Sequence, residues 1–413
     1  MLRSVAVVLS GNVMSAALNF AYMYGLAVFL SEEDFGKISL ILTVVAIVEI
    51  VMNFGSSSAM IGYVNGDEMA SRNGLKARVF CFSFRWSLLM SVFSFIILTA
   101  IGSNFGIAFY EIIVVVVVSF CLSMYSNVIA SYQSDQNWKV QNIFLIVNNA
   151  TKLLVVCFLF ALVIIGFFDI SDYDLVLVSL MIYSFGLVFL AIFISIKKGF
   201  FRIGQKIQKD MMVFRYAYPL GLANITIILS MRLDGMLIVL LLGPVAFAAY
   251  SAANILGLAI PLLTRSLMNV AFSVASKKST EYIHQVWQQQ IKIAPYLLGV
   301  ASCICLISPY LMGWLYGEKY SDGSVVFLIL SLGYLGGVFF VPLESYFYAH
   351  RPKRILFYKL GSLLSLIVTG YPFIYFYGIE GAATCVLFSK VVSWCLVLRD
   401  TRTGLKEIPI VAI

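Results

Sequence analysis

The sequence predicts an all-α polytopic membrane protein with about 12 transmembrane helices, and three observations lead to this fold class. The chain of 413 residues is 61% hydrophobic and only 12% charged, with a mean hydropathy of +0.96. Soluble globular proteins carry about 25% charged residues. Apolar runs of about 18 residues or more, each long enough to cross a bilayer, recur from end to end. The basic residues gather in every second loop between these runs, which excludes an ordinary soluble protein.

The apolar runs and their polar breaks define the expected helices. The first six lie near 5–30, 37–62, 79–102, 107–130, 141–166 and 173–196, and the second six near 213–242, 246–275, 288–308, 323–348, 355–377 and 379–398. The first run is longer than the roughly 7–15 apolar residues of a secretory signal, so it is predicted to be an uncleaved span. The last two spans are separated only by the short break "YFYGIEGA".

Lys and Arg predict the orientation, because cytoplasmic loops of membrane proteins carry an excess of them. With the N-terminus inside, the outer loops hold only Lys37 and Lys319 of the 28 Lys and Arg residues. Five others lie inside spans, and the remaining 21 lie in inner loops, at helix ends and in the tail. Both termini are therefore predicted in the cytoplasm. The distribution of the basic residues thus explains the net charge of +8 by membrane topology, so this charge does not indicate nucleic acid as a partner.

The chain is expected to form two pseudo-symmetric six-helix lobes around a central cavity. An N-lobe at 1–196 and a C-lobe at 213–413 are joined by a basic cytoplasmic linker at 197–212. Weak internal similarity supports this division: segments after the first and fourth helices match segments after the seventh and tenth, at offsets of about 212 to 218 residues. Transporters are commonly built from such repeats, with the substrate site between them.

Eight charged residues inside the predicted spans are candidate site residues, because a charge at the bilayer centre costs about 2.5–3.5 kcal/mol. The cations are Arg85, Lys152, Arg232, Arg265 and Lys390, and the acids are Glu49, Asp234 and Glu344. Three acids cannot neutralise five cations, so the surplus favours an anionic ligand such as a phosphate or diphosphate. The acids are candidates for ion coupling or charge pairing. The alternative for the whole set is structural ion pairs that hold the helices together.

Helical spacing adds two expectations about these charges. Arg232 and Asp234, two positions apart, point about 200° away from each other, so one should line a cavity while the other meets a neighbouring helix. Polar residues share faces with several charges, which indicates a hydrated interior; helix one, for example, carries a stripe of Asn12, Ser15, Asn19 and Tyr22.

Proline and cysteine complete the pattern within the spans. All nine prolines lie in the second half, and Pro219 and Pro261 are candidate hinges, with a static packing kink as the alternative. The seven cysteines lie within or beside apolar runs and form no C-x-x-C pair, so they are expected to be small buried side chains.

The sequence contains no P-loop, no H-E-x-x-H, no Cys/His metal spacing and no nucleophile elbow. It therefore predicts neither an enzyme nor a cofactor nor a metal site. One segment imitates a catalytic motif: "SEEDFG" at 31–36 carries the acidic pair Glu32 and Asp34, which would fit a membrane glycosyltransferase. Ser31 with Asp34 three residues later also resembles a capping box, which is the favoured interpretation.

Four segments resemble the Wzx-type polysaccharide repeat-unit flippases of the multidrug/oligosaccharidyl-lipid/polysaccharide exporter superfamily. They begin with "EEDFGKISLILT" at 32–63, "YPLGLANITIIL" at 218–256, "YGEKYSDGSVVF" at 316–334 and "YAHRPKRILFYK" at 348–383. The resemblance covers almost the whole chain. It implies two six-helix lobes that rock around a cationic cavity in the bacterial inner membrane.

The resemblance also implies a substrate, an undecaprenyl-diphosphate-linked oligosaccharide that is moved from the cytoplasmic to the periplasmic leaflet for O-antigen or capsule assembly. The five intramembrane cations would hold the diphosphate. Sugar contacts would come from Asn12, Asn19, Tyr22, Asn148 and Asn254. Partners besides the lipid bilayer would be a polysaccharide polymerase and a chain-length regulator. The alternative is a multidrug or small-molecule exporter of the same fold, and a membrane glycosyltransferase is less favoured.

Overall fold

A computed structural model describes residues 2–65, 72–135, 137–165, 170–197, 210–258, 260–261 and 282–407. Within these ranges the protein contains α-helices and two short 3-10 helices but no strand. Ten of the described helical segments are long and apolar enough to cross a membrane. The predicted class, an all-helical polytopic membrane protein, is confirmed.

The chain folds as two compact units. The first unit comprises Met1–Leu26 and Lys37–Arg232, and the second comprises Ala27–Gly36 and Leu233–Ile413. Most of the expected linker lies outside the described residues, and the expected lobe boundaries stay a prediction.

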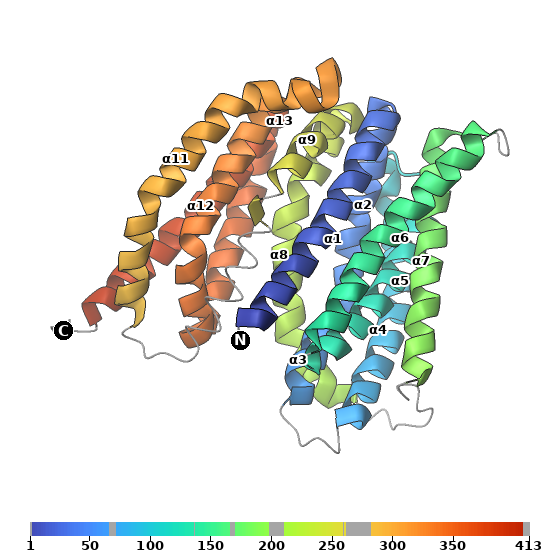
Figure 1. Ribbon diagram of the computed structural model, residues 1–413, viewed down its shortest axis with the longest axis horizontal. Helices are drawn as coiled ribbons and strands as arrows, with labels where there is room; N and C mark the ends of the chain where they lie inside the picture. The colour runs from blue at the N-terminus through green and yellow to red at the C-terminus, as the bar shows by residue number, and fades with distance from the viewer. Residues whose placement is uncertain are drawn as a thin grey trace. The chain divides into compact units, whose positions relative to one another are not determined.

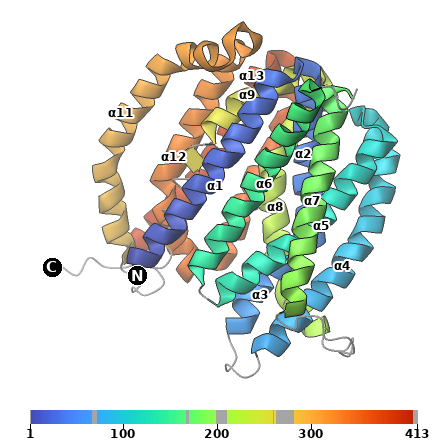
Figure 2. The same cartoon turned by 45° about the vertical axis from the view of Figure 1, so that its right-hand side comes forward.

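The helices of the first unit run from α1 to the greater part of α8. They are α1 (Leu2–Phe29), α2 (Glu32–Asn53), α3 (Ser56–Asn65), α4 (Arg72–Ile101), η1 (Gly102–Phe105), α5 (Phe109–Ser134), α6 (Trp138–Ile164), α7 (Asp172–Lys197) and α8 (Asp210–Leu242). Within the unit α5 packs against α3, α4, α6 and α7, and Figures 1 and 2 show α1 beside α6.

The span expected at 37–62 is broken into α2 and α3. Phe54 and Gly55 have positive φ angles of 39° and 75° at the break. A side chain on Gly55 would lie 2.6 Å from the carbonyl oxygen of Ala217 in α8, so glycine permits this close approach. Trp86 and Ser87 of α4 donate hydrogen bonds of 3.1 and 2.9 Å to carbonyls at the end of α2. The break therefore leaves these helix-terminal carbonyls satisfied.

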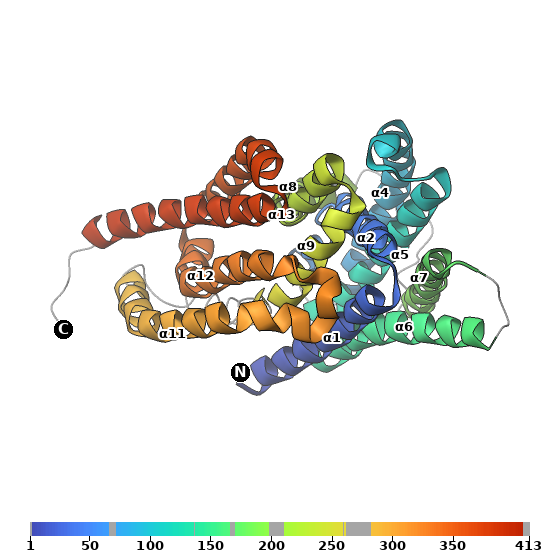
Figure 3. The same cartoon turned by 90° about the horizontal axis from the view of Figure 1, so that it is seen from above.

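The second unit contains α9 (Pro244–Gly257), α11 (Tyr282–Tyr316), η3 (Gly317–Tyr320), α12 (Gly323–His350) and α13 (Pro352–Glu407). α12 packs against α9, α11 and α13. α13 holds the last two expected spans, which separate at Gly378 (φ 59°, ψ −139°), within the short break that the sequence indicates; Figure 3 shows its two arms. α11 extends beyond its expected end at 308 and continues through Pro309.

The end of α1 belongs to the second unit because η3 binds it. Lys319 donates hydrogen bonds to the carbonyl oxygens of Ala27, at 2.9 Å, and Leu30, and the Tyr320 hydroxyl also donates to Ala27. These carbonyls are among those that a helix end leaves without an intrahelical donor. Lys319 thus acts as a cap for the first helix.

The segment "SEEDFG" forms a helix cap, as the favoured interpretation predicts. The Ser31 hydroxyl donates to the Asp34 carboxylate at 2.6 Å, and the Asp34 backbone N–H donates to the Ser31 oxygen at 3.1 Å. Ser171 and Asp174 repeat this arrangement at the start of α7, with distances of 2.7 and 3.1 Å.

Candidate functional site

Seven of the eight intramembrane charges lie within the described part of the chain, and Arg265 lies outside it. Each unit brings some of these charges together with tyrosine and amide side chains. The two groups differ in composition, and we describe each within its own unit.

In the first unit Lys152 lies against an aromatic ring. Its Nζ is 3.9 Å from the centroid of the Tyr22 ring, which places α6 against α1 at this depth. Ser15 of α1 bonds to two residues that precede Lys152 on α6. Asn149, one turn earlier, donates to the Ser15 hydroxyl at 2.6 Å, and this hydroxyl donates to the carbonyl of Leu145, two turns earlier, at 3.3 Å. These polar contacts position Lys152 over the ring.

Lys152 has no acid beside it among the described residues. In the part of the chain that the structure describes, no carboxylate lies within ion-pair distance of its ammonium group. The charge that acts on it is that of Arg232 in α8, which is also positive. Tyr22 is 1% exposed, and its hydroxyl has no hydrogen-bond partner among the described residues. This group is therefore cationic and rich in donors.

Other expected residues of the first unit have partners of their own. The Tyr183 hydroxyl donates to the Asn148 side chain at 2.5 Å, and the Ser126 hydroxyl donates to the Glu49 carboxylate at 2.9 Å. Asn12 and Asn19 are half-buried on α1, whereas Arg85 is exposed on α4. The structure thus groups Lys152, Arg232 and Tyr22, and holds Asn148 and Glu49 through hydroxyl groups.

In the second unit Asp234 is buried and receives a hydrogen bond from the Tyr250 hydroxyl. Arg232, two residues earlier, acts instead on Lys152 of the first unit. Which of the two side chains lines a cavity stays a prediction.

Lys390 of the second unit repeats the arrangement of Lys152 on a tyrosine ring. Its Nζ is 4.5 Å from the centroid of Tyr334, and the Tyr334 hydroxyl donates to the Asn254 side chain at 2.7 Å. Lys390 experiences the positive charge of Lys359 and, unlike Lys152, also the negative charges of Glu344 and Asp234. This group is therefore closer to neutral than the one in the first unit.

Glu344 forms an ion pair with Lys359 at 2.9 Å. Two further ion pairs lie near helix ends, Lys76 with Asp135 and Arg354 with Asp400 at 3.1 Å. Lys76 is buried, with 2% of its side chain exposed, although the sequence places it in an inner loop region. Each of these pairs joins helical segments of one unit. This is the structural role that the sequence leaves open as the alternative to anion binding.

Sequence analysis missed the tyrosines that bind the charges and amides, namely Tyr183, Tyr250 and Tyr334. Spacing along the chain gave no signal for these three contacts, because each tyrosine and its partner lie on different helices. Of the two candidate hinges, Pro219 lies inside α8, which continues through it, and Pro261 is half-buried.

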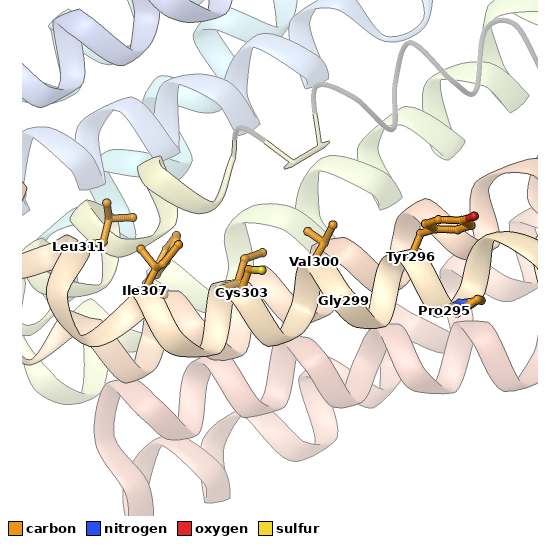
Figure 4. A pocket seen from close by; sticks show the side chains of 9 residues that line it. Pro295, Tyr296, Gly299, Val300, Cys303, Ile307 and Leu311 are labelled. Atoms are coloured by element: carbon orange, nitrogen blue, oxygen red, sulfur yellow. The ribbon is translucent and has the colours of Figure 1, made fainter.

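The second unit also has an apolar groove of about 590 Å³ along α11 (Figure 4). It is lined by Pro295, Tyr296, Gly299, Val300, Cys303, Ile304, Ile307, Leu311 and Phe327. None of the expected site residues is among them. The groove has no charged side chain, so it cannot provide the anion site that the intramembrane cations indicate.

The side chains of the two groups are suited to binding an anion or a hydroxyl-rich ligand. Across the described ranges, no cluster of three or more His, Cys, Asp or Glu side chains could hold a metal ion. Lysine and arginine groups on rigid helices can bind an anion, and amides and phenols can hydrogen-bond a hydroxyl-rich ligand.

Comparison with solved structures shows the same fold in transporters. The lipid II flippase MurJ in an inward closed conformation aligns with a TM-score of 0.77 at 12% identity, over 96% of this chain and 87% of that one. An inward-facing multidrug resistance MATE family transporter of the MOP superfamily aligns with a TM-score of 0.63 at 16% identity, over 97% and 99% of the chains. A mutant of the Vibrio cholerae MATE transporter VcmN gives a TM-score of 0.67 at 12% identity, over 98% and 96%.

The sequence itself points to one family. A search of the curated proteins gave no match. The family described as polysaccharide biosynthesis protein matches residues 26–325, which is most of the chain and includes helices of both units. The chain therefore belongs to the polysaccharide biosynthesis protein family.

Proposed function

We propose that the protein is a flippase for an undecaprenyl-diphosphate-linked oligosaccharide repeat unit. It moves this lipid from the cytoplasmic to the periplasmic leaflet of the bacterial inner membrane by alternating access, for O-antigen or capsular polysaccharide assembly. The observation that carries the proposal is the Lys152 ammonium, which within the described residues lies on an aromatic ring and not beside a carboxylate, and on which the positive charge of Arg232 acts.

Electrostatics supports an anionic substrate. A positive charge inside a membrane span, such as that of Lys152, is unfavourable, and a buried charge is normally paired. A diphosphate provides the missing negative charge and several acceptor oxygens for ammonium and guanidinium groups. In this proposal the cations Arg85, Lys152, Arg232, Arg265 and Lys390 attract the diphosphate during its passage, with Lys152 and Arg232 as its principal ligands in the first unit.

Family and fold agree with the proposal. A polysaccharide biosynthesis protein with this fold needs no catalytic centre to serve assembly, because moving the lipid-linked repeat unit is itself a required step. MurJ, which has the same fold, is a flippase for lipid II. Amide side chains such as Asn12, Asn19 and Asn254 suit hydrogen bonds to sugar hydroxyls. A polysaccharide polymerase and a chain-length regulator are the expected partners.

A multidrug exporter is the second candidate, because MATE transporters share the fold. Such an exporter of cationic drugs would need surplus acid at its site. In the first unit Glu49 is the only acid among the predicted site residues, and the cations Lys152 and Arg232 outnumber it. An anionic lipid therefore fits this unit better than a cationic drug does.

The test is a leaflet-crossing assay in liposomes that contain labelled undecaprenyl-diphosphate oligosaccharide. Wild type should accelerate crossing over empty vesicles, and Lys152→Gln should slow it at least tenfold, since a lost charge-assisted contact costs about 1.5–3 kcal/mol. Lys292→Gln, which removes an exposed lysine on α11, is the matched control and should keep the wild-type rate. Yield and thermal stability are measured for each variant.

Three results would count against the proposal. Wild-type protein that gives no acceleration would shift the assignment to drug export. Equal rates for wild type and Lys152→Gln would remove the anion site. Loss of folded Lys152→Gln protein would support the structural role of this charge.

A further inference from the structure

The contact between Lys152 and Tyr22 contains more hydrogen-bond donors than acceptors. A lysine ammonium offers three N–H donors and no acceptor, and a phenol offers one O–H donor. Within the described residues, the ammonium lies over the face of the Tyr22 ring, at 3.9 Å from the centroid, and the Tyr22 hydroxyl has no partner. Such a group is incomplete, because buried polar atoms in folded proteins nearly always have partners.

Other buried tyrosines of the first unit show what Tyr22 lacks. The Tyr125 hydroxyl donates to the Phe144 carbonyl at 2.8 Å, and the Tyr183 hydroxyl donates to Asn148 at 2.5 Å. Tyr22 is as deeply buried as Tyr125, at 1% exposure each, so bulk solvent does not reach its hydroxyl. A buried hydroxyl without a partner lowers the stability of the fold, so a purely structural role does not explain the Tyr22 hydroxyl.

The missing partner must be an acceptor with a negative charge. Lys152 and the nearby Arg232 both repel cations, and neither accepts a hydrogen bond. A phosphate group carries several acceptor oxygens around one centre, so it can contact an ammonium and a hydroxyl together. A sugar hydroxyl would satisfy Tyr22 but would leave the charge of Lys152 uncompensated.

We propose that Tyr22 contacts the phosphate group of the substrate: its hydroxyl donates a hydrogen bond to a phosphate oxygen, and the Lys152 ammonium leaves the ring face to pair with the same group. Until then the ring holds the ammonium by a cation–π contact, which orients the charge without neutralising it. This inference rests on the proposed function and assigns Tyr22 to the diphosphate instead of the sugar.

The experiment measures the affinity of the purified full-length protein for undecaprenyl diphosphate by native mass spectrometry, with undecaprenol as the uncharged probe. Inorganic pyrophosphate is added as a competitor, which separates recognition of the anion alone from recognition of the whole lipid. The variants are Tyr22→Phe and Lys152→Gln. Tyr125→Phe is the matched control, because it removes a buried hydroxyl of the same unit that does have a partner.

We expect Tyr22→Phe to weaken undecaprenyl diphosphate binding about tenfold, as for one lost hydrogen bond to a charged group, and to leave undecaprenol binding unchanged. Its melting temperature should equal or exceed that of wild type, because no bond is lost. Tyr125→Phe should show the opposite pattern, with a lower melting temperature and unchanged affinity. Pyrophosphate should displace the lipid from wild type at lower concentration than from Tyr22→Phe.

The outcomes separate this inference from the function on which it rests. Wild-type affinity in Tyr22→Phe, together with loss of diphosphate preference in Lys152→Gln, would overturn the role of Tyr22 and leave the flippase proposal standing. Equal affinity of wild type for undecaprenol and undecaprenyl diphosphate would overturn both. Unfolding of Tyr22→Phe would show that the hydroxyl has a structural partner, which also overturns the inference.

Discussion

Individual charged residues in this protein have two kinds of surroundings. Glu344 with Lys359 and Lys76 with Asp135 are ion pairs within one unit. Lys152 instead lies on a tyrosine ring and has no acid at ion-pair distance among the described residues. Paired charges contribute to stability chiefly by avoiding an unpaired charge. We therefore expect substitutions to act on stability at the first kind of residue and on substrate binding at the second.

Glu344→Gln tests the first kind. It removes the negative charge from the ion pair with Lys359, whose side chain is 28% exposed. The free energy of unfolding should fall by about 1–3 kcal/mol, less than for a fully buried pair because water still reaches the lysine. The measurement is thermal and denaturant unfolding of the purified protein in detergent. Folded protein that has lost transport at wild-type stability would instead place Glu344 in ion coupling.

At the level of secondary structure, helix breaks are less predictable than helix positions. Hydropathy locates the span at 37–62, yet the structure divides it at Phe54 and Gly55. The cause is not local: α8 approaches so closely that a side chain on Gly55 would lie 2.7 Å from the Gly221 nitrogen. At Gly378, by contrast, the short polar break in the sequence predicts the observed bend.

Gly55→Ala should therefore be strongly unfavourable. The new methyl group meets the backbone of α8, and the φ of 75° is one that alanine rarely adopts. We expect the unfolding free energy to fall by about 1–3 kcal/mol. Gly186→Ala is the control, because a side chain there meets nothing within 4 Å and α7 should gain about 0.5–1 kcal/mol. Similar melting temperatures for the two variants would contradict the close approach of α8.

The start of α2 offers a test of the enzyme alternative. Replacing Glu32 by Gln and Asp34 by Asn removes both acids of the "SEEDFG" segment. If the segment is only a helix cap, leaflet crossing should be nearly unchanged. The free energy of unfolding should fall by about 0.5–2 kcal/mol, because the Ser31 hydroxyl loses its hydrogen bond to a charged carboxylate. Stable protein without activity would instead indicate that the acids take part in catalysis.

For the molecule as a whole, the bilayer changes what hydrophobicity means. The cysteines illustrate this: the sequence predicts seven buried side chains, but Cys157, Cys303, Cys305 and Cys395 are exposed. That prediction is wrong because it assumes an aqueous surround. Where hydrocarbon is the solvent, apolar side chains have no reason to turn inward, so helices place small and polar residues between themselves. The apolar lining of the α11 groove follows from the same rule.

Transport by the whole protein should respond to membrane potential. Moving about two negative charges outward across roughly 100 mV, inside negative, releases on the order of 4–5 kcal/mol. Imposing this potential on proteoliposomes should accelerate outward movement of the labelled lipid, with Glu49 or Asp234 as candidate groups for a coupled counter-ion. The control dissipates the potential while ion gradients are held constant. An unchanged rate under that control would exclude the potential as the driving force.

The sequence by itself determined the helical membrane class, most span positions, the Ser31 cap and the surplus of intramembrane cations. These properties depend on hydropathy, spacing and composition along the chain, which are local. Only the tertiary structure decided that Lys152 meets Tyr22, that Asp234 meets Tyr250 and that α8 breaks the second span. The partner of a buried charge depends on which helices pack together, and many pairings of apolar helices bury similar surfaces. Close packing selects one of them, so the chemistry of the candidate site emerges only when the helices are assembled.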